Sequence, residues 1–293
     1  MTVSRFNVPI TNETVTTYRA WGLGFSNAFK AVGLIQTANT GQVNWATVSL
    51  PTTGVITRDY EIFRFNDALQ ATRPVFIRIS YGTSNVGDRP FLSVRAGTAT
   101  DGAGNLTGLI SNEFPVYINL APLPFESPQL VFGDTSSVAF SGSTSSTGQP
   151  YASIFACVIE RSRSELGIPN GDGLWLSVGT TSVSPVAQTQ ILSFTLNSFT
   201  PVVSGHPFAV PTKLSSFLMG TALAVFPAII ATPKVQGPGL ALLACGFSDF
   251  PRLTEQQITI GGTLRNYIAI SGVTSVSQDF AAQRANGLLL RWE

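Results

Sequence analysis

The sequence has few charged residues, and this shortage excludes several classes of function. Lysine and arginine together number 17, and aspartate and glutamate 16, in 293 residues with one histidine. Charged residues make up 11% of the chain, against about a quarter in an average soluble protein. The net charge of +1 and the lack of a long basic cluster argue against binding to nucleic acid. Acids, bases and metal ligands come from these same residue types, so candidates for catalysis are also few.

Cysteine and long apolar runs are scarce as well. Cys157 and Cys245 are the two cysteines, and both lie in apolar segments that are typical of buried free thiols. The most apolar run, residues 217–231, is shorter than the roughly 20 residues of a membrane span and contains Pro227. It predicts buried strands and no membrane contact. The first residues show no secretory signal, so we expect synthesis in the cytoplasm.

One amphipathic helix is predicted near residues 13–32. Apolar side chains recur there at spacings of three or four residues, which is the period of a helix with one buried face. Gly33 is placed to end the helix, whereas Gly22 and Gly24 weaken the pattern. The residues that form the apolar stripe are Val15, Tyr18, Trp21, Phe25, Phe29 and Val32.

After the helix the hydrophobic period changes to two, which predicts strands. The clearest strand covers residues 74–81, with Val75, Ile77, Ile79 and Tyr81 on one face. Further strands separated by Ser, Thr, Gly and Pro turns follow to the end of the chain, which is typical of a β-sandwich. The fold class we expect is therefore mainly β, with β-sandwich-like sheets and one amphipathic N-terminal helix.

Two more local predictions can be compared with the structure. Residues 43–48 alternate in polarity and predict a strand, whereas residues 141–150 predict the most flexible turn.

Three prolines fall within residues 121–128, where we place a domain boundary. The predicted domains are a β-rich N-terminal domain, 1–122, and an all-β C-terminal domain, 129–293. The same prolines could equally form a stiff crossover within one domain.

The candidates for catalytic or metal chemistry are weak. Asp59 and Glu61 share a strand face and could serve a hydrolase, but flanking arginines favour an exposed, ion-paired edge. Residues 101–105, DGAGN, resemble half a calcium loop, and a plain glycine turn is the favoured interpretation. The segment 161–163, RSR, is expected to be a solvated strand end. We therefore expect no enzymatic activity, no cofactor and no metal.

Five arginines lie close together in the first half of the chain. Arginine is favoured at protein interfaces because its planar guanidinium binds carboxylates through two parallel hydrogen bonds. A contact surface between subunits and ion pairing within one sheet are equally compatible with this cluster. The residues are Arg64, Arg73, Arg78, Arg89 and Arg95.

Two tryptophans, Trp175 and Trp45, are the candidates for an aromatic platform that binds a host surface glycan. A buried position in the core is the favoured interpretation for both residues. Their exposure in the folded chain separates these two interpretations.

The N-terminal part of the chain resembles a recurrent type of tailed-bacteriophage virion protein. The resemblance covers about the first 110 residues and the last few, and it transfers no functional residue. The segments that carry it are TGQVNW (40–45), YEIFRFND (60–67), PVFIRISYG (74–82), GTATDGAGN (97–105) and LLLRWE (288–293).

The resemblance implies a non-enzymatic structural protein of a phage particle, of the tail or baseplate, made in the host cytoplasm and located in the virion. Its implied partners are itself and other virion proteins, without nucleic acid or membrane. The low charge independently favours a homo-oligomer, because symmetric interfaces cover neutral surface. The alternatives are a receptor-binding or carbohydrate-binding adhesin module of the tail fibre type and a capsid decoration (cement) protein.

Overall fold

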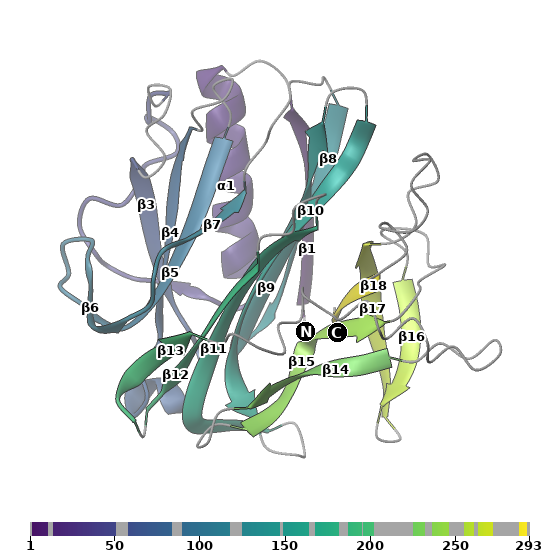
Figure 1. Ribbon diagram of the computed structural model, residues 1–293. Helices are drawn as coiled ribbons and strands as arrows, with labels where there is room; N and C mark the ends of the chain where they lie inside the picture. The colour runs from purple at the N-terminus through teal and green to yellow at the C-terminus, as the bar shows by residue number, and fades with distance from the viewer. Residues whose placement is uncertain are drawn as a thin grey trace.

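The computed structural model has a mainly β fold with one α-helix in the described part of the chain (Figure 1). The predicted fold class is confirmed. The structure describes residues 2–10, 14–50, 58–83, 90–117, 125–146, 149–163, 168–181, 187–194, 196–201, 225–231, 236–245, 255–260, 263–271 and 287–291. None of the helices within these ranges has both the length and the apolar character needed to cross a lipid bilayer.

The largest sheet, sheet A, contains seven antiparallel strands in the order β1-β8-β9-β10-β11-β12-β13. The first strand in the chain, β1, lies at its edge and pairs along its whole length with β8. The strands are β1 (Thr2–Ile10), β8 (Phe125–Asp134), β9 (Ser137–Ser146), β10 (Gln149–Arg163), β11 (Pro169–Thr181), β12 (Ala187–Ser193) and β13 (Ser198–Pro201).

Sheet B contains six strands, ordered β2-β3-β4-β5-β6 with β7 paired to β5. A short 3-10 helix, η1 (Ala68–Ala71), connects β3 to β4. The strands are β2 (Ile35–Gln36), β3 (Asp59–Arg64), β4 (Phe76–Thr83), β5 (Pro90–Thr100), β6 (Leu106–Ile110) and β7 (Phe114–Tyr117).

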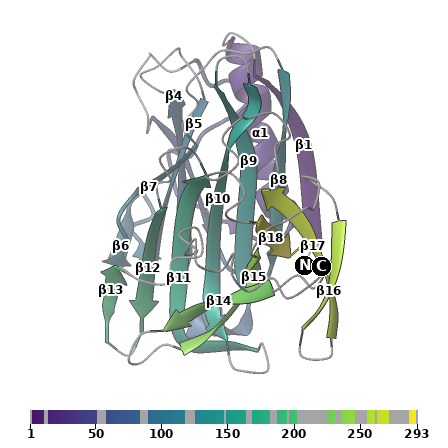
Figure 2. The same ribbon diagram turned by 45° about the vertical axis from the view of Figure 1, so that its right-hand side comes forward.

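Sheet C contains five strands in the order β14-β15-β18-β17-β16. Its strand β15 lies against β10 of sheet A, on the side away from sheet B (Figures 1 and 2). The strands are β14 (Val225–Ala231), β15 (Gln236–Cys245), β16 (Glu255–Ile260), β17 (Thr263–Ser271) and β18 (Gly287–Arg291).

The predicted N-terminal helix is confirmed as α1 (Val15–Ala31). Thr14 is its N-cap: the Thr14 hydroxyl accepts a hydrogen bond of 3.1 Å from the backbone N–H of Thr17. Gly33 follows the last turn with a φ of +110°, a left-handed conformation that glycine adopts without steric strain. Gly33 therefore ends the helix as the sequence predicts, and Thr14 caps its N-terminal end.

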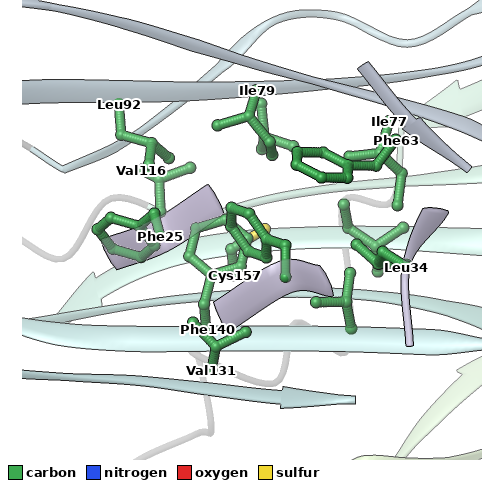
Figure 3. Close-up of a cluster of buried hydrophobic side chains, with 14 of the residues drawn as sticks. Phe25, Leu34, Phe63, Ile77, Ile79, Leu92, Val116, Val131, Phe140 and Cys157 are labelled. Atoms are coloured by element: carbon green, nitrogen blue, oxygen red, sulfur yellow. The ribbon is translucent and has the colours of Figure 1, made fainter. Parts of the chain in front are cut away.

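The main core forms where α1 lies between sheets A and B (Figures 1 and 3). The aromatic stripe of α1 contacts both sheets: the Phe29 ring packs edge-on against Phe63 of sheet B and Phe140 of sheet A, at centroid distances of 5.5 and 5.3 Å. Trp21 packs in the same way on Tyr81 of sheet B. Because aromatic residues bury large apolar areas, this stripe is the main hydrophobic contact between the two sheets.

Trp45 covers the N-terminal half of α1 from a loop rather than from the predicted strand. The strand prediction for residues 43–48 is wrong, because Asn44 forms a turn whose carbonyl accepts from the N–H groups of Thr47 and Val48. The Trp45 ring lies directly on Gly22 of α1, where a Cβ atom would be 1.9 Å from ring atom Cη2. Gly22 therefore makes room for the indole, which explains a glycine inside a helix.

Residues 141–150 also differ from the prediction. Ser141 to Ser146 continue β9, and Gln149 already belongs to β10, so most of this segment forms a hairpin of two long strands. Pairing with β10 overrides the low strand propensity of its serines and glycines.

The second half of the proposed domain boundary at residues 121–128 belongs to β8 of sheet A, and residues 121–124 lie outside the described residues. β1 lies before this boundary and pairs with β8, which begins at Phe125. The main core likewise combines residues from both sides, such as Phe63 and Phe140. The two parts thus share one sheet and one core, and their ability to fold separately stays a prediction.

A buried ion-pair network joins the end of β10 to η1 and to β8. The guanidinium of Arg161 is fully buried, forms two hydrogen bonds to the Asp67 carboxylate and lies 5.4 Å from the Phe65 ring centroid. Arg163 binds Glu160 and, at 3.3 Å, Asp134. The expectation of a solvated strand end at 161–163 is wrong, because opposite charges on neighbouring segments allow both arginines to be buried.

We predict that Gly22→Ala destabilises the protein by about 1–3 kcal/mol, the usual range for overpacking. An exposed helical glycine gives the opposite result, a gain of up to about 1 kcal/mol. Thermal and urea unfolding of the variant provide the measurement. The Trp45→Phe background is the control, since the shorter ring removes the clashing atoms. An equal cost of Gly22→Ala in both backgrounds contradicts the contact.

We also predict that Asp67→Ala destabilises the protein by about 3–5 kcal/mol, because it leaves the Arg161 guanidinium buried without its carboxylate. Glu113→Ala is the matched control: its ion pair with Arg95 has side chains that are 32% and 36% exposed. That change should cost less than about 1 kcal/mol. Similar unfolding midpoints for the two variants contradict the assignment of a buried, stabilising pair.

Candidate functional site

The face of sheet B that points away from α1 carries three of the five predicted interface arginines. Along β4, Ile77 and Ile79 point to the core, so the alternate residue Arg78 points to the opposite, outer face. Arg95 of β5 is the register partner of Arg78 and lies on the same face. Arg64 reaches this face from β3. We call this surface the outer face of sheet B.

Arg78 is held against an aromatic ring. Its guanidinium carbon lies 4.7 Å from the centroid of the Tyr60 ring, which is the geometry of a cation–π contact. The Tyr60 hydroxyl donates a hydrogen bond of 2.7 Å to the carbonyl of Thr40 and is fixed by it. Gly104, with a φ of +103°, leaves space for this hydroxyl, because a Cβ atom there would be 2.1 Å from it. The loops beside β3 therefore fix the position of Arg78.

Arg95 is held by a carboxylate on the same face. Glu113 lies 3.5 Å from the Arg95 guanidinium and also accepts a hydrogen bond of 2.6 Å from the Ser93 hydroxyl. Both partners of the ion pair are about one-third exposed, so solvent screens their attraction. Glu113 is thus the acidic member of an otherwise basic surface.

The other predicted arginines are arranged differently. Arg64 donates a hydrogen bond of 3.3 Å to the carbonyl of Phe65. Arg73 is exposed and lies 5.7 Å from the ring centroid of Phe194, which follows β12 of sheet A. Arg89 lies outside the described residues. The structure therefore brings Arg78, Arg95 and Arg64 to one face and puts Arg73 elsewhere; a subunit contact at these residues stays a prediction.

The two candidate glycan-binding tryptophans are buried. Trp175 is 2% exposed and Trp45 is 7% exposed. Trp175 lies in β11 opposite Glu160 of β10, on the side of sheet A that faces sheet C. A sugar platform needs an accessible ring face, and in this chain both rings are packed in the interior instead.

The acidic pair Asp59 and Glu61 faces α1, and the expectation of an exposed, ion-paired edge is wrong for Glu61. Its carboxylate is 1% exposed and accepts hydrogen bonds from Ser26 at 2.6 Å, Gln36 at 3.0 Å and Tyr81 at 2.9 Å. Burial raises the pKa of Glu61, while the hydrogen bonds from Ser26 and Tyr81 oppose the rise. These neutral donors hold the carboxylate between α1 and sheet B.

Asp59 has a related structural role. Its carboxylate accepts a hydrogen bond of 2.8 Å from the Tyr18 hydroxyl of α1. Burial raises the pKa of Asp59 as well, against the lowering effects of Tyr18 and the nearby Arg58 charge. Both carboxylates thus anchor the helix on β3 rather than face each other across a groove.

Residues 101–105 form the glycine turn that the sequence favours. The Asp101 carboxylate accepts hydrogen bonds from the backbone N–H groups of Ala103 and Asn105 and from the Asn105 side chain. The Asn105 contacts lower the pKa of Asp101. Across the described residues, no three His, Cys, Asp or Glu side chains gather into a group that could hold a metal ion.

Tyr60 and Glu113 complete the arginine-bearing face, and sequence reasoning did not single them out for it. The alternation along 74–81 and 91–96 does put Arg78 and Arg95 on outward positions. Their direct pairing, however, depends on the register between β4 and β5, which cannot be read from periodicity.

We predict a pH-dependent stability difference between the protein and its Glu61→Gln variant. The raised pKa means that folded protein binds the Glu61 proton more tightly than unfolded protein. Stability from this group is therefore present at low pH and is lost as pH rises from the ordinary value of 4.5 through the raised one. The variant has no such loss, so its relative stability should increase with pH. Urea unfolding from pH 4 to 8 measures the difference, and a constant difference contradicts the prediction.

Comparison with protein-family models, with curated proteins and with solved structures finds no match for this chain. The functional inference below therefore depends on the residues of the chain itself.

Proposed function

We propose that the chain is a non-enzymatic structural component of a tailed-phage virion, in the tail or baseplate, that assembles through protein–protein interfaces. The observation that carries this proposal is the structural use of its carboxylates. Glu61 anchors α1, Asp67 and Glu160 pair with buried arginines, and Asp101 closes its own turn. These acidic groups hold the fold together and are already occupied by internal donors.

The composition supports an assembled protein over a free monomer. The chain has 33 charged residues, the sum of 17 basic and 16 acidic ones. Several of them, including Arg161 and Glu160, are fully buried and contribute nothing to the surface. The outer surface is consequently poorer in charge than the composition indicates. Neutral surfaces of this kind are stabilised by contact with other subunits.

The resemblance to phage virion proteins supports the same proposal. Its segments 60–67 and 74–82 contain most of β3 and most of β4, and 97–105 contains the turn that packs on Tyr60. These segments build sheet B and its loops. A resemblance in strands and turns, rather than in catalytic residues, is expected among structural proteins. The proposed partners are other copies of the chain and other virion proteins, and the proposed location is the virion after synthesis in the host cytoplasm.

The alternative functions have less support. The adhesin hypothesis relies on Trp45 and Trp175, whose rings are buried. A capsid decoration role would need the same kind of interfaces and differs only in location on the particle. The location experiment below therefore separates it from a tail or baseplate role.

We predict that purified particles of the phage that encodes this chain contain it in a fixed copy number. Quantitative mass spectrometry of the particles measures the copy number, and immunogold electron microscopy with an antibody to the chain gives its position. Labelling of the tail or baseplate is the expected result. Labelling over the head would instead indicate a decoration protein, and absence from washed particles contradicts the proposal.

A further inference from the structure

The outer face of sheet B contains two like charges at directly opposite positions. Arg78 of β4 and Arg95 of β5 are register partners in an antiparallel pair. The Cβ atoms of such partners are about 5 Å apart, and like charges placed there destabilise the sheet unless other groups compensate. Without compensation the arginine pair therefore lowers the stability of the chain.

The charges on this face do not balance within the described part of the chain. Arg95 has the Glu113 carboxylate at 3.5 Å. Arg64 donates to the carbonyl of Phe65, which has no net charge. Arg78 has no ion pair among the described residues. Three positive groups thus face one negative group, and the excess is positive.

Arg78 is fixed in position without being neutralised. Its guanidinium lies over the Tyr60 ring, and the Tyr60 hydroxyl is itself bound to the carbonyl of Thr40. The ring attracts the cation but supplies no net negative charge. The Nε atom of Arg78 is covered, so the terminal amino groups of this partly exposed side chain are the donors that another molecule can reach. A cation held in this way loses little freedom when it binds an anion.

The arginines that serve the fold itself are arranged differently. Arg161 is bound by the carboxylate of Asp67, and Arg163 by that of Glu160. Each of these buried cations has an acidic partner inside the chain. Arg78 has an ordered environment of the same kind but lacks the carboxylate, which indicates that its anion comes from another molecule.

We propose that an acidic segment of another virion protein docks on the outer face of sheet B, with its carboxylates bound by Arg78 and Arg95. Charge complementarity favours this occupant, since a carboxylate supplies the sign of charge that the face lacks. The planar guanidinium forms short, charge-assisted hydrogen bonds with a carboxylate. This inference deepens the proposed function and rests on it for the expectation that the chain assembles with other virion proteins.

The size of the basic surface favours a protein partner over a nucleic acid. A nucleic acid presents a continuous row of phosphates and needs an extended basic track. Here Glu113 interrupts the arginines, and Asp101 lies in the turn that packs on Tyr60. The chain as a whole has a net charge of only +1. A few separate carboxylates match this surface better than a polyphosphate backbone does.

The test measures binding of a fluorescein-labelled oligoglutamate peptide to the full chain by fluorescence anisotropy. Saturable binding that weakens with added salt is expected, and Arg78→Gln should weaken it at least about tenfold. Glu113→Gln should instead strengthen binding, because it frees Arg95 from its internal partner. A purely structural role of these residues does not produce this gain.

The matched control is Arg73→Gln, an equal charge change away from this face, which should leave binding unchanged. Circular dichroism and thermal unfolding establish that each variant is folded. If Arg78→Gln fails to fold, Arg78→Lys replaces it: the lysine keeps the charge but not the planar donor group, and weaker binding is again expected.

Three results overturn the proposal. The first is the lack of saturable binding to oligoglutamate, and the second is an equal loss of binding in Arg78→Gln and Arg73→Gln. The third is binding of an oligothymidylate of equal charge as tight as that of the peptide, which would indicate a general polyanion surface.

The outcome is independent of the particle experiment. A chain that is found in particles but does not bind the peptide through Arg78 removes this docking surface and leaves the virion proposal in place. Arg78-dependent binding with no signal in particles retains an acid-binding surface and removes the virion proposal.

Discussion

The position of α1 between two sheets is the constraint on which most of this structure depends. The aromatic stripe of α1 lies between sheets A and B (Figure 3), while β7 of sheet B contacts β10 and β11 of sheet A directly. Phe29 contacts both sheets, and Trp45 closes over the glycine of the helix. Ser26 of α1 is buried as well, so its hydroxyl needs an internal acceptor, and Glu61 provides it.

The same constraint explains where the few charges of the chain are located. Burial of one side of α1 and of the inner faces of sheets A and B leaves interior polar groups that must be paired, because an unpaired buried charge is strongly destabilising. Glu61 is paired with neutral donors, whereas Arg161 is paired with Asp67 across two structural elements. Such contacts fix the relative position of η1 and β10 more specifically than apolar packing alone.

Much of the fold could be predicted from the sequence, because periodicity reports which residues face a core. The apolar spacing gave the bounds of α1 to within two residues at each end, and the alternation at 74–81 identified the buried face of β4. The errors have local causes. Asn44 directs its segment into a turn, and the Ser-rich 141–146 becomes strand only because β10 pairs with it.

The candidate surface was less predictable than the fold. The sequence identified a cluster of arginines but not which of them would be neighbours, because Arg78 and Arg95 meet only through the register of two strands. Burial of Arg161 and Arg163 was missed for a related reason: Asp67, the partner of Arg161, and Asp134, one of the two partners of Arg163, are distant in the sequence. No local pattern records a pairing over such separations.

The pairing of β1 with β8 has a consequence for how the protein is made. Thr2 lies opposite Gly133, so a ribosome must add more than a hundred residues after β1 before its partner strand exists. At roughly 5–20 residues per second this takes on the order of ten seconds. During that interval the nine residues of β1 have no native partner strand, so this edge of sheet A forms only after translation has passed β8.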